Sequence, residues 1–239
     1  MPTALVTGAS AGLGRALAAA LVSRKWTVVG DGRDAAALSA AARETGFTAV
    51  PGDVADPAHR AQLAAACPSL DLLVNNASSL GVSPLPPLSG YPLAELEDVY
   101  RVNVFAPLAL TQLLLPALTA ARGTVLDISS DAAVEAYEGW GAYGSAKAAL
   151  DQLTAVLGAE NPELAVYAVD PGDLRTAMHQ RAFPGEDISD RPLPSSVVPA
   201  FLRLLDERPP SGRYRAADLP SIHAPATALN GGASRPEAL

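Results

Sequence analysis

The chain has 239 residues, of which 49% are hydrophobic and 18% charged, and its formal net charge is −8. This is the composition of a globular protein, and the acidic balance argues against a surface for nucleic acid or anionic membrane. A strand pattern begins at residue 4, no apolar run reaches the ~18 residues of a membrane span, and the single Cys67, expected to be buried, fits a reducing compartment. We therefore expect a cytoplasmic protein with neither nucleic-acid nor membrane partners.

The first predicted strand, residues 4–7, ends in a glycine-rich turn that leads into a predicted helix at residues 13–23. The turn reads Thr-Gly-x-x-x-Gly-x-Gly from Thr7 to Gly14. Glycines let the backbone approach a ligand closely, and a helix N-terminus offers free N–H groups and the positive end of its dipole. This segment is predicted to cradle the phosphates of a nucleotide.

The second predicted strand, residues 26–30, is followed by Asp31, Gly32 and Arg33. An acidic residue at the end of this strand binds the 2′-hydroxyl of NAD, whereas an Arg favours the 2′-phosphate of NADP. Counting along the strand puts Gly32 at the selecting position with Arg33 beside it, which predicts NADP(H). A shift of one residue would put Asp31 there and predict NAD(H), so both cofactors stay open.

Two further strands are predicted at residues 48–52 and 70–74, separated by a helix at residues 57–66. Strands that alternate with helices predict an α/β fold, a Rossmann-like doubly wound parallel sheet flanked by helices. We expect one domain at residues 1–219, followed by a Pro-, Ala- and Gly-rich tail at residues 220–239. Ligands bind beyond the carboxyl ends of such strands, where Thr7, Asp53 and Asn75 all fall.

A long helix predicted at residues 92–119 places Asn103 and Pro107 on its apolar face. In an α-helix the N–H of residue 107 would bond the carbonyl of residue 103. Proline has no N–H, and its ring displaces that carbonyl. The carbonyl of Asn103 is therefore predicted to be free to hold a water.

A fifth strand, residues 124–128, ends in Ser129 and Ser130, and an Ala-rich helix at residues 142–157 carries Tyr143 and Lys147. Side chains four residues apart lie on one helix face. A neighbouring cation lowers the pKa of a phenol from its usual value of about 10 toward the working pH. Tyr143 is thus a candidate acid–base group, although this spacing alone is weak evidence.

A sixth strand is predicted at residues 165–169, followed by the segment from Asp170 to Thr176. Residues 177–194 are polar and Pro-rich, as in a lid or binding loop. A final helix is predicted at residues 195–206 and a short last strand at residues 213–216.

Together these features resemble the short-chain dehydrogenase/reductase family, in its standard single-domain branch, from residue 3 to about residue 216. The resemblance is carried by Thr7-Gly8-x-x-x-Gly12-x-Gly14, Asp53, Asn75-Asn76-Ala77, Asn103, Ser130, Tyr143-x-x-x-Lys147 and Pro171-Gly172-x-x-x-Thr176. Two departures are minor: Ser78 replaces the last glycine of the Asn-Asn-Ala-Gly motif, and the family's usual Asp-Gly-Gly ending is missing.

The resemblance implies that Tyr143 exchanges a proton with the substrate oxygen and that Ser130 hydrogen-bonds the same oxygen. Lys147 would bind the nicotinamide ribose and lower the pKa of Tyr143, and Asn103 would hold a water that links Lys147 to solvent. No metal is predicted. The implied cofactor contacts are Gly8, Ser10, Gly12, Leu13, Gly14, Arg33, Asp53, Val54, Asn75, Ala77, Tyr143, Lys147, Pro171, Gly172, Leu174 and Thr176.

The resemblance favours an NADPH-dependent ketone or aldehyde reductase, with an NAD-dependent alcohol dehydrogenase or a non-catalytic dinucleotide-binding protein as alternatives. The small-molecule carbonyl or alcohol substrate stays open, and His179 is predicted to be a loop residue rather than a second acid. A homodimer or homotetramer is expected, because the helices at residues 92–119 and 142–157 carry more apolar residues than one sheet face covers. Candidates for the wall of the substrate pocket are Tyr137, Trp140, Met178, His179 and Phe183.

Overall fold

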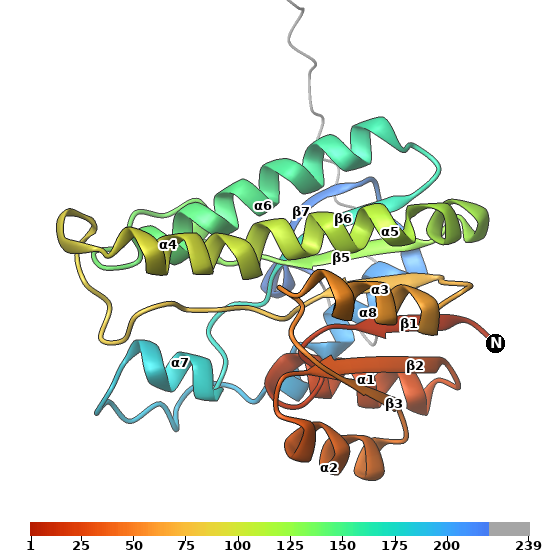
Figure 1. The fold of residues 1–239 in the computed structure, drawn as a ribbon, viewed down its shortest axis with the longest axis horizontal. Helices are drawn as coiled ribbons and strands as arrows, with labels where there is room; N and C mark the ends of the chain where they lie inside the picture. Colours follow the sequence, from red (N-terminus) through yellow and green to blue (C-terminus); the bar gives the residue numbers. More distant parts are fainter. Residues whose placement is uncertain (220–239) are drawn as a thin grey trace, which may run out of the picture.

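A seven-stranded parallel sheet forms the centre of the computed structural model, which describes residues 1–219 (Figure 1). The strand order is β3-β2-β1-β4-β5-β6-β7, and every neighbouring pair is parallel. This order confirms the predicted doubly wound sheet and reverses between β1 and β4, where such folds bind ligands. The predicted tail, residues 220–239, lies outside the described residues. The strands are β1 (Thr3–Val6), β2 (Thr27–Gly32), β3 (Thr48–Pro51), β4 (Leu72–Asn75), β5 (Thr124–Ile128), β6 (Ala165–Asp170) and β7 (Gly212–Arg215).

Helices cover both faces of the sheet, because successive side chains of a strand point to opposite faces. On one face, Val6 packs in a cluster with Leu17 and Phe201. On the other face, Leu5 packs in a cluster with Leu114. The first face is covered by α1 (Gly12–Ser23), α2 (Ala35–Thr45) and α8 (Val198–Glu207), and the second by α3 (Pro57–Ala66), α5 (Ala106–Ala121) and α6 (Gly141–Glu160).

The helix predicted at residues 92–119 is divided into α4 (Leu93–Tyr100), a π-helical turn η2 (Arg101–Phe105) and α5. In the turn, the N–H of Ala106 donates to the carbonyl of Arg101, five residues back. Pro107 follows directly and has no N–H to donate, so a continuous α-helical ladder cannot pass through it. The missing N–H of Pro107 could be predicted from the sequence, but the π-helical turn before it could not.

The segment Leu93–Ala121 is long and apolar enough to cross a membrane by length and composition, which corrects the expectation that no run reaches that length. Its inner face carries Leu110, Leu114 and Leu118, all buried against the sheet. Its outer face leaves Phe105 and Leu113 at least half exposed, at 57% and 50%. The helix is therefore part of the core, with a second apolar face that the described part of the chain does not cover.

The segment predicted as a lid, residues 177–194, contains the short helix α7 (Ala177–Ala182). Thr176 begins this helix by accepting a hydrogen bond from the N–H of His179 at 3.1 Å. In Figure 1 α7 stands apart from the layered body of the protein, beyond the carboxyl end of β6. Residues of α7 and residues at the carboxyl ends of the strands together line the pocket described below.

The glycine turn after β1 gives a test of the fold. A Cβ atom on Gly14 would lie 2.3 Å from the carbonyl oxygen of Gly8 and 2.4 Å from Nδ2 of Asn76. Gly14→Ala is therefore expected to destabilise the protein by about 1–3 kcal/mol, as overpacking does. Gly90→Ala is the matched control, because a Cβ there meets nothing within 4 Å. Urea denaturation of both variants checks this; equal stabilities would contradict the close approach.

Candidate active site

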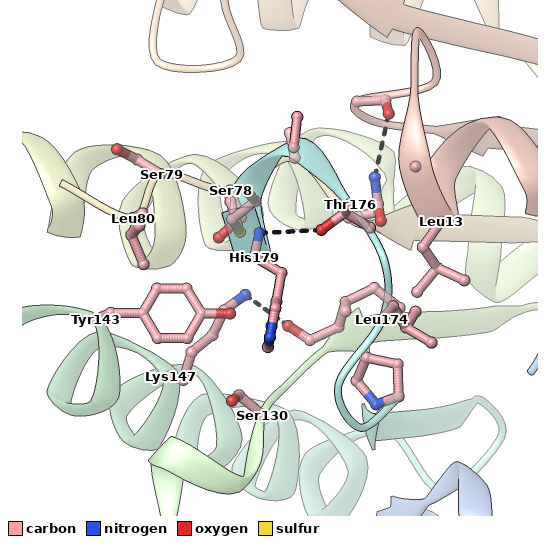
Figure 2. Close-up of a pocket in the computed structure, with 18 of the residues that line it drawn as sticks. Leu13, Ser78, Ser79, Leu80, Ser130, Tyr143, Lys147, Leu174, Thr176 and His179 are labelled. Atoms are coloured by element: carbon pink, nitrogen blue, oxygen red, sulfur yellow. Dashed lines mark hydrogen bonds between the residues drawn. The ribbon is translucent and has the colours of Figure 1, made fainter. Parts of the chain in front are cut away.

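A pocket of about 660 Å³ lies beyond the carboxyl ends of β1, β2, β4, β5 and β6 and beneath the lid helix α7. Its lining runs from the glycine turn and Arg33 at one end to Trp140 and Phe183 at the other. Figure 2 shows the middle of the pocket, with Tyr143 and Lys147 on one side and Leu13, Leu174 and Thr176 on the other. The predicted convergence of the strand ends into one site is thus borne out.

The glycine turn is held in place from two neighbouring strands. Gly8 has φ of +67° and donates its N–H to Oδ1 of Asp31 at 2.7 Å. Asn76 donates its side-chain amide to the carbonyls of Thr7 at 2.8 Å and Gly8 at 3.2 Å. The first turn of α1 has no side-chain cap and no acidic residue, so its N–H groups remain available to an anion. This arrangement fits a bound phosphate group.

Asp31 lines the pocket, but both oxygens of its carboxylate have partners within the protein. Its side chain is 1% exposed, with Oδ1 bound to Gly8 and Oδ2 lying 3.1 Å from Nε2 of His59. The hydrogen bond that the His59 ring donates to Asp31 is the main cause that raises the pKa of His59 above its usual range. Asp31 therefore holds the glycine turn and a buried histidine, and it is Arg33 that lies exposed at the pocket wall.

Asn75 was predicted to be a cofactor contact, but it does not line the pocket. It is the last residue of β4, 3% exposed, and its side chain turns away from the pocket to donate to Asp127 Oδ1 at 2.7 Å and to Thr111 Oγ1 at 3.4 Å. Its neighbour Asn76 lines the pocket instead, since alternate residues of a strand point to opposite faces. Side chains along a strand alternate between its two faces, and this alternation could have shown that Asn75 and Asn76 point in opposite directions.

The remaining predicted cofactor residues line one continuous wall of the pocket. Gly172 has φ of +72°, and its N–H donates to Asp170 Oδ1 at 2.9 Å, which shapes the turn after β6. The residues that line the wall as predicted are Gly8, Ser10, Gly12, Leu13, Arg33, Asp53, Val54, Ala77, Pro171, Gly172, Leu174 and Thr176, while Gly14 lies behind the turn.

Tyr143 and Lys147 lie on one face of α6, and both are buried, at 8% and 2% exposure. The ammonium nitrogen of Lys147 is 5.5 Å from the centroid of the Tyr143 ring and donates to the carbonyl oxygen of Ile128 at 2.6 Å (Figure 2). Burial lowers the pKa of Lys147 to about 8, although the carboxylates of Asp127 and Asp151 oppose this. Lys147 therefore sits at the carboxyl end of β5 as a desolvated cation.

The pKa of Tyr143 moves in the opposite direction to the one predicted. Burial raises it to about 12, while hydrogen bonds with Ser78 and Ser130 lower it and the carboxylates of Asp131 and Asp170 raise it further. The prediction considered only the cation, whereas desolvation of the phenolate is the larger effect in this pocket. In the protein alone, Tyr143 is thus a protonated phenol at neutral pH.

Asn103 lies behind the pocket rather than in its lining. It is fully buried, and its side chain accepts from the Ser79 N–H at 2.7 Å and the Ser78 hydroxyl at 3.1 Å and donates to the Ser79 carbonyl at 2.8 Å. Asn103 thereby fixes the loop after β4 against the π-turn of the neighbouring helix. Ser78, noted in the sequence only as a departure from the motif, joins this loop to Tyr143.

The opposite end of the pocket is aromatic, and all five predicted wall residues contribute to it. The Trp140 ring lies 5.7 Å from that of Tyr143 and 6.0 Å from that of Phe183, which in turn lies 5.0 Å from the His179 ring. His179, predicted to be a loop residue, is in a helix and 9% exposed. Sequence reasoning missed the carboxylates that line this end, Asp131, Asp170 and Asp173.

A parallel sheet of this order, with a glycine turn at its switch point and a Tyr–Lys pair beside it, defines a nucleotide-dependent oxidoreductase class. The chain matches the model of the short chain dehydrogenase family over residues 2–187. It belongs to that family.

Named relatives agree with this assignment. The chain is 35% identical to serine 3-dehydrogenase of Agrobacterium fabrum over 183 residues, which is 73% of this chain and 72% of that protein. It is 33% identical to sepiapterin reductase of Bos taurus over 199 residues, 74% of each chain. Among solved structures, a short chain dehydrogenase of Shigella flexneri complexed with NADP has a TM-score of 0.83 and 32% identity, covering 90% of this chain and 97% of that one. One of Escherichia coli complexed with NADPH has a TM-score of 0.82 and 33% identity, covering 90% and 96%.

The buried His59–Asp31 pair predicts a pH dependence of stability. Because the folded-state pKa of His59 is raised, the pair stabilises the protein fully below the unfolded pKa of about 6.5, and the contribution is lost as pH rises through the folded-state value. The variant His59→Gln should therefore lose more free energy of unfolding, relative to wild type, at pH 5.5 than at pH 9. Urea denaturation at both pH values measures this. A loss that is independent of pH would mean that folding leaves the pKa of His59 unchanged, which would contradict the prediction.

Proposed function

We propose that this protein is an NADP(H)-dependent oxidoreductase that interconverts a ketone or aldehyde with the corresponding alcohol, with Tyr143 as the acid–base residue. The observation that carries the proposal is the meeting of Tyr143, Ser130 and Lys147 at one wall of a pocket that also contains the glycine turn. When bound, the cofactor supplies the hydride. The residues of the chain bind it, orient the substrate and move the proton.

The high pKa of Tyr143 favours the reducing direction. A phenol with a pKa of about 12 keeps its proton at neutral pH and can give it to a carbonyl oxygen that becomes an alkoxide as the hydride arrives. The hydroxyl of Ser130, which donates to Asp131 Oδ1 at 2.9 Å and also interacts with Tyr143, would turn from that carboxylate to hydrogen-bond the same oxygen. The oxidising direction needs the phenolate, which burial disfavours.

Lys147 contributes a positive charge next to the phenol. With a pKa of about 8, its amine is mostly protonated at neutral pH, and its bond to the Ile128 carbonyl fixes the end of the side chain. A cation 5.5 Å from the Tyr143 ring helps to stabilise the negative charge that develops on the phenol oxygen as the proton leaves. Asn103 supports this wall from behind by holding the loop that carries Ser78.

Three observations support NADP(H) as the cofactor. Gly32 at the end of β2 carries no carboxylate to repel a 2′-phosphate, and Arg33 beside it is exposed at the pocket wall. The carboxylate of Asp31, the residue that would favour NAD(H), is already hydrogen-bonded to Gly8 and His59. Two similar solved structures are complexes with NADP and NADPH.

The variant Tyr143→Phe tests the chemistry. Only the phenol oxygen is lost, so kcat should fall at least about 100-fold, as for the loss of a positioned acid, while the Kd for NADPH changes little. Tyr100→Phe, a substitution outside the pocket lining, is the matched control. The measurement is NADPH oxidation over a panel of ketones and aldehydes of graded size. Residual activity above about a hundredth of wild type would remove Tyr143 from this role.

Cofactor choice is tested by Arg33→Ala. If Arg33 meets the 2′-phosphate, a charge-assisted contact should give NADPH a roughly 10- to 150-fold advantage over NADH, and the variant should erase most of it. Gly32→Asp should reverse the preference, whereas Asp31→Asn should weaken both cofactors together by loosening the glycine turn. The control is Arg43→Ala on the exposed side of α2. Dissociation constants for both cofactors decide; an unchanged ratio in Arg33→Ala would contradict the assignment.

We further propose that the protein is a cytoplasmic homodimer or homotetramer. The exposed apolar side chains of Phe105 in the π-turn η2, Leu113 on α5 and Val156 on α6 support this, since symmetric pairing of such helices would cover them. The free and buried Cys67, whose pKa burial raises to about 11, is consistent with a reducing compartment. Light scattering at micromolar concentration should give two or four times the mass of the chain. A monomer would contradict the proposal.

A further inference from the structure

One buried side-chain polar atom in the pocket lining lacks a hydrogen-bond partner within the described part of the chain. His179 is 9% exposed, yet its Nε2 atom is buried without a partner. Buried polar groups in folded proteins are nearly always hydrogen-bonded, because losing water without a replacement costs free energy. Figure 2 shows the His179 ring extending from the lid helix into the pocket, between Tyr143 and Leu174. An orphaned ring nitrogen in this position points to a ligand group that completes it.

The backbone around His179 holds the ring in this direction. The N–H of His179 donates to Thr176 Oγ1 at the start of α7, and the N–H of Arg175 donates to the carbonyl of Pro192 at 2.8 Å. The ring also packs against Phe183, with 5.0 Å between the centroids. The imidazole is thus placed by the fold of the lid before any ligand arrives.

The surroundings of the ring indicate which kind of group it would bind. Nδ1 lies 3.8 Å from Oδ1 of Asp173, and this nearby carboxylate favours the tautomer with the proton on Nδ1 and the lone pair on Nε2. Nε2 then accepts a hydrogen bond, and its partner must be a donor. Asp131 and Asp170 also line the pocket, so an anionic group would be repelled.

The rest of this end of the pocket is apolar. Leu80, Trp140, Met178 and Phe183 line it, and the rings of Tyr143, Trp140, Phe183 and His179 follow one another at centroid distances between 5.0 and 6.0 Å. A bound molecule would therefore place an apolar or aromatic body against this wall. Its polar contacts would be at Tyr143 and Ser130 on one side and at His179 on the other.

We propose that His179 binds a second polar group of the substrate, a hydroxyl or amino group that donates to Nε2, and so selects hydroxylated or aminated carbonyl compounds over plain ones. This inference rests on the proposed function for the reacting carbonyl but uses a different residue and a different part of the substrate. A site built to hydrogen-bond a hydroxyl rejects the analogue that lacks it, because the buried polar atom is then left unpaired. His179 is a specificity residue in this proposal and takes no part in the proton transfer.

The kinetic test uses phenyl alkyl ketones in matched sets of three. Each set holds the plain ketone, its hydroxylated counterpart and the methyl ether of that counterpart, with the hydroxyl one, two or three carbons from the carbonyl. For at least one set, wild-type kcat/KM with NADPH should be about 10-fold higher for the hydroxylated ketone than for either analogue. The ether keeps the oxygen but cannot donate, so it separates hydrogen bonding from size.

The variant His179→Phe keeps a ring and removes both nitrogens. It should reduce the preference for the hydroxylated ketone over the plain ketone and over the ether to about 1, mainly through a higher KM for the hydroxylated ketone. A preference that survives in His179→Phe, or an ether that reacts as well as the alcohol, would overturn the proposal.

A binding measurement separates this inference from the proposed function. The chain has three histidines, and the ¹⁵N side-chain resonances of His179 are assigned by their loss in His179→Phe. Adding the hydroxylated ketone to the protein saturated with NADP⁺ should shift the Nε2 resonance, whereas the plain ketone should not. A shift without turnover of any ketone would support the His179 site and contradict the reductase. No shift with any hydroxylated ketone would contradict the His179 site, whether or not ketones are reduced.

Discussion

The glycine turn after β1 is the constraint on which the rest of the site depends. Its backbone is bound by Asp31 from β2 and by Asn76 from the end of β4, and Gly14 of α1 approaches it too closely for any side chain. Three neighbouring elements are thereby tied to one point at the edge of the sheet. Because parallel strands end together at that edge, fixing this turn also fixes where β5 and β6 deliver Ser130 and Asp170.

Burial has a larger effect than neighbouring charges on the pKa values of Tyr143 and Lys147. Tyr143 and Lys147 are both desolvated, and desolvation disfavours the charged form of each, so the pKa of the phenol is raised and that of the amine lowered. The two shifts move the pKa values apart, from ordinary values of 10.0 and 10.5 to about 12 for Tyr143 and about 8 for Lys147. A site of this kind holds a neutral acid beside a cation, which suits the donation of a proton to a reduced carbonyl.

The fold and most of the site could be predicted from the sequence, because they depend on local patterns. Hydrophobic periodicity located every strand to within about two residues, and the motif spacings placed Tyr143, Lys147 and Ser130 in one pocket. The motifs located Asn75 and Asn103, but the side chains of both residues hydrogen-bond other parts of the protein and do not line the pocket. Which way a side chain turns at the end of a strand or inside a helix depends on packing partners distant in sequence, such as Asp127 for Asn75 and Ser79 for Asn103.

The sequence by itself determined the family, the parallel sheet and the choice of Tyr143 and Lys147 as the proposed acid–base pair, since each depends on residue types at fixed spacing along the chain. Only the tertiary structure decided the role of Asp31, the direction of the pKa shift of Tyr143 and the inward orientation of His179. Asp31 meets a histidine 28 residues away, Tyr143 is desolvated by several elements at once, and the lid places His179 against Phe183 and the pocket. Burial and the direction of a side chain are properties of the whole packed chain, and no local pattern encodes them.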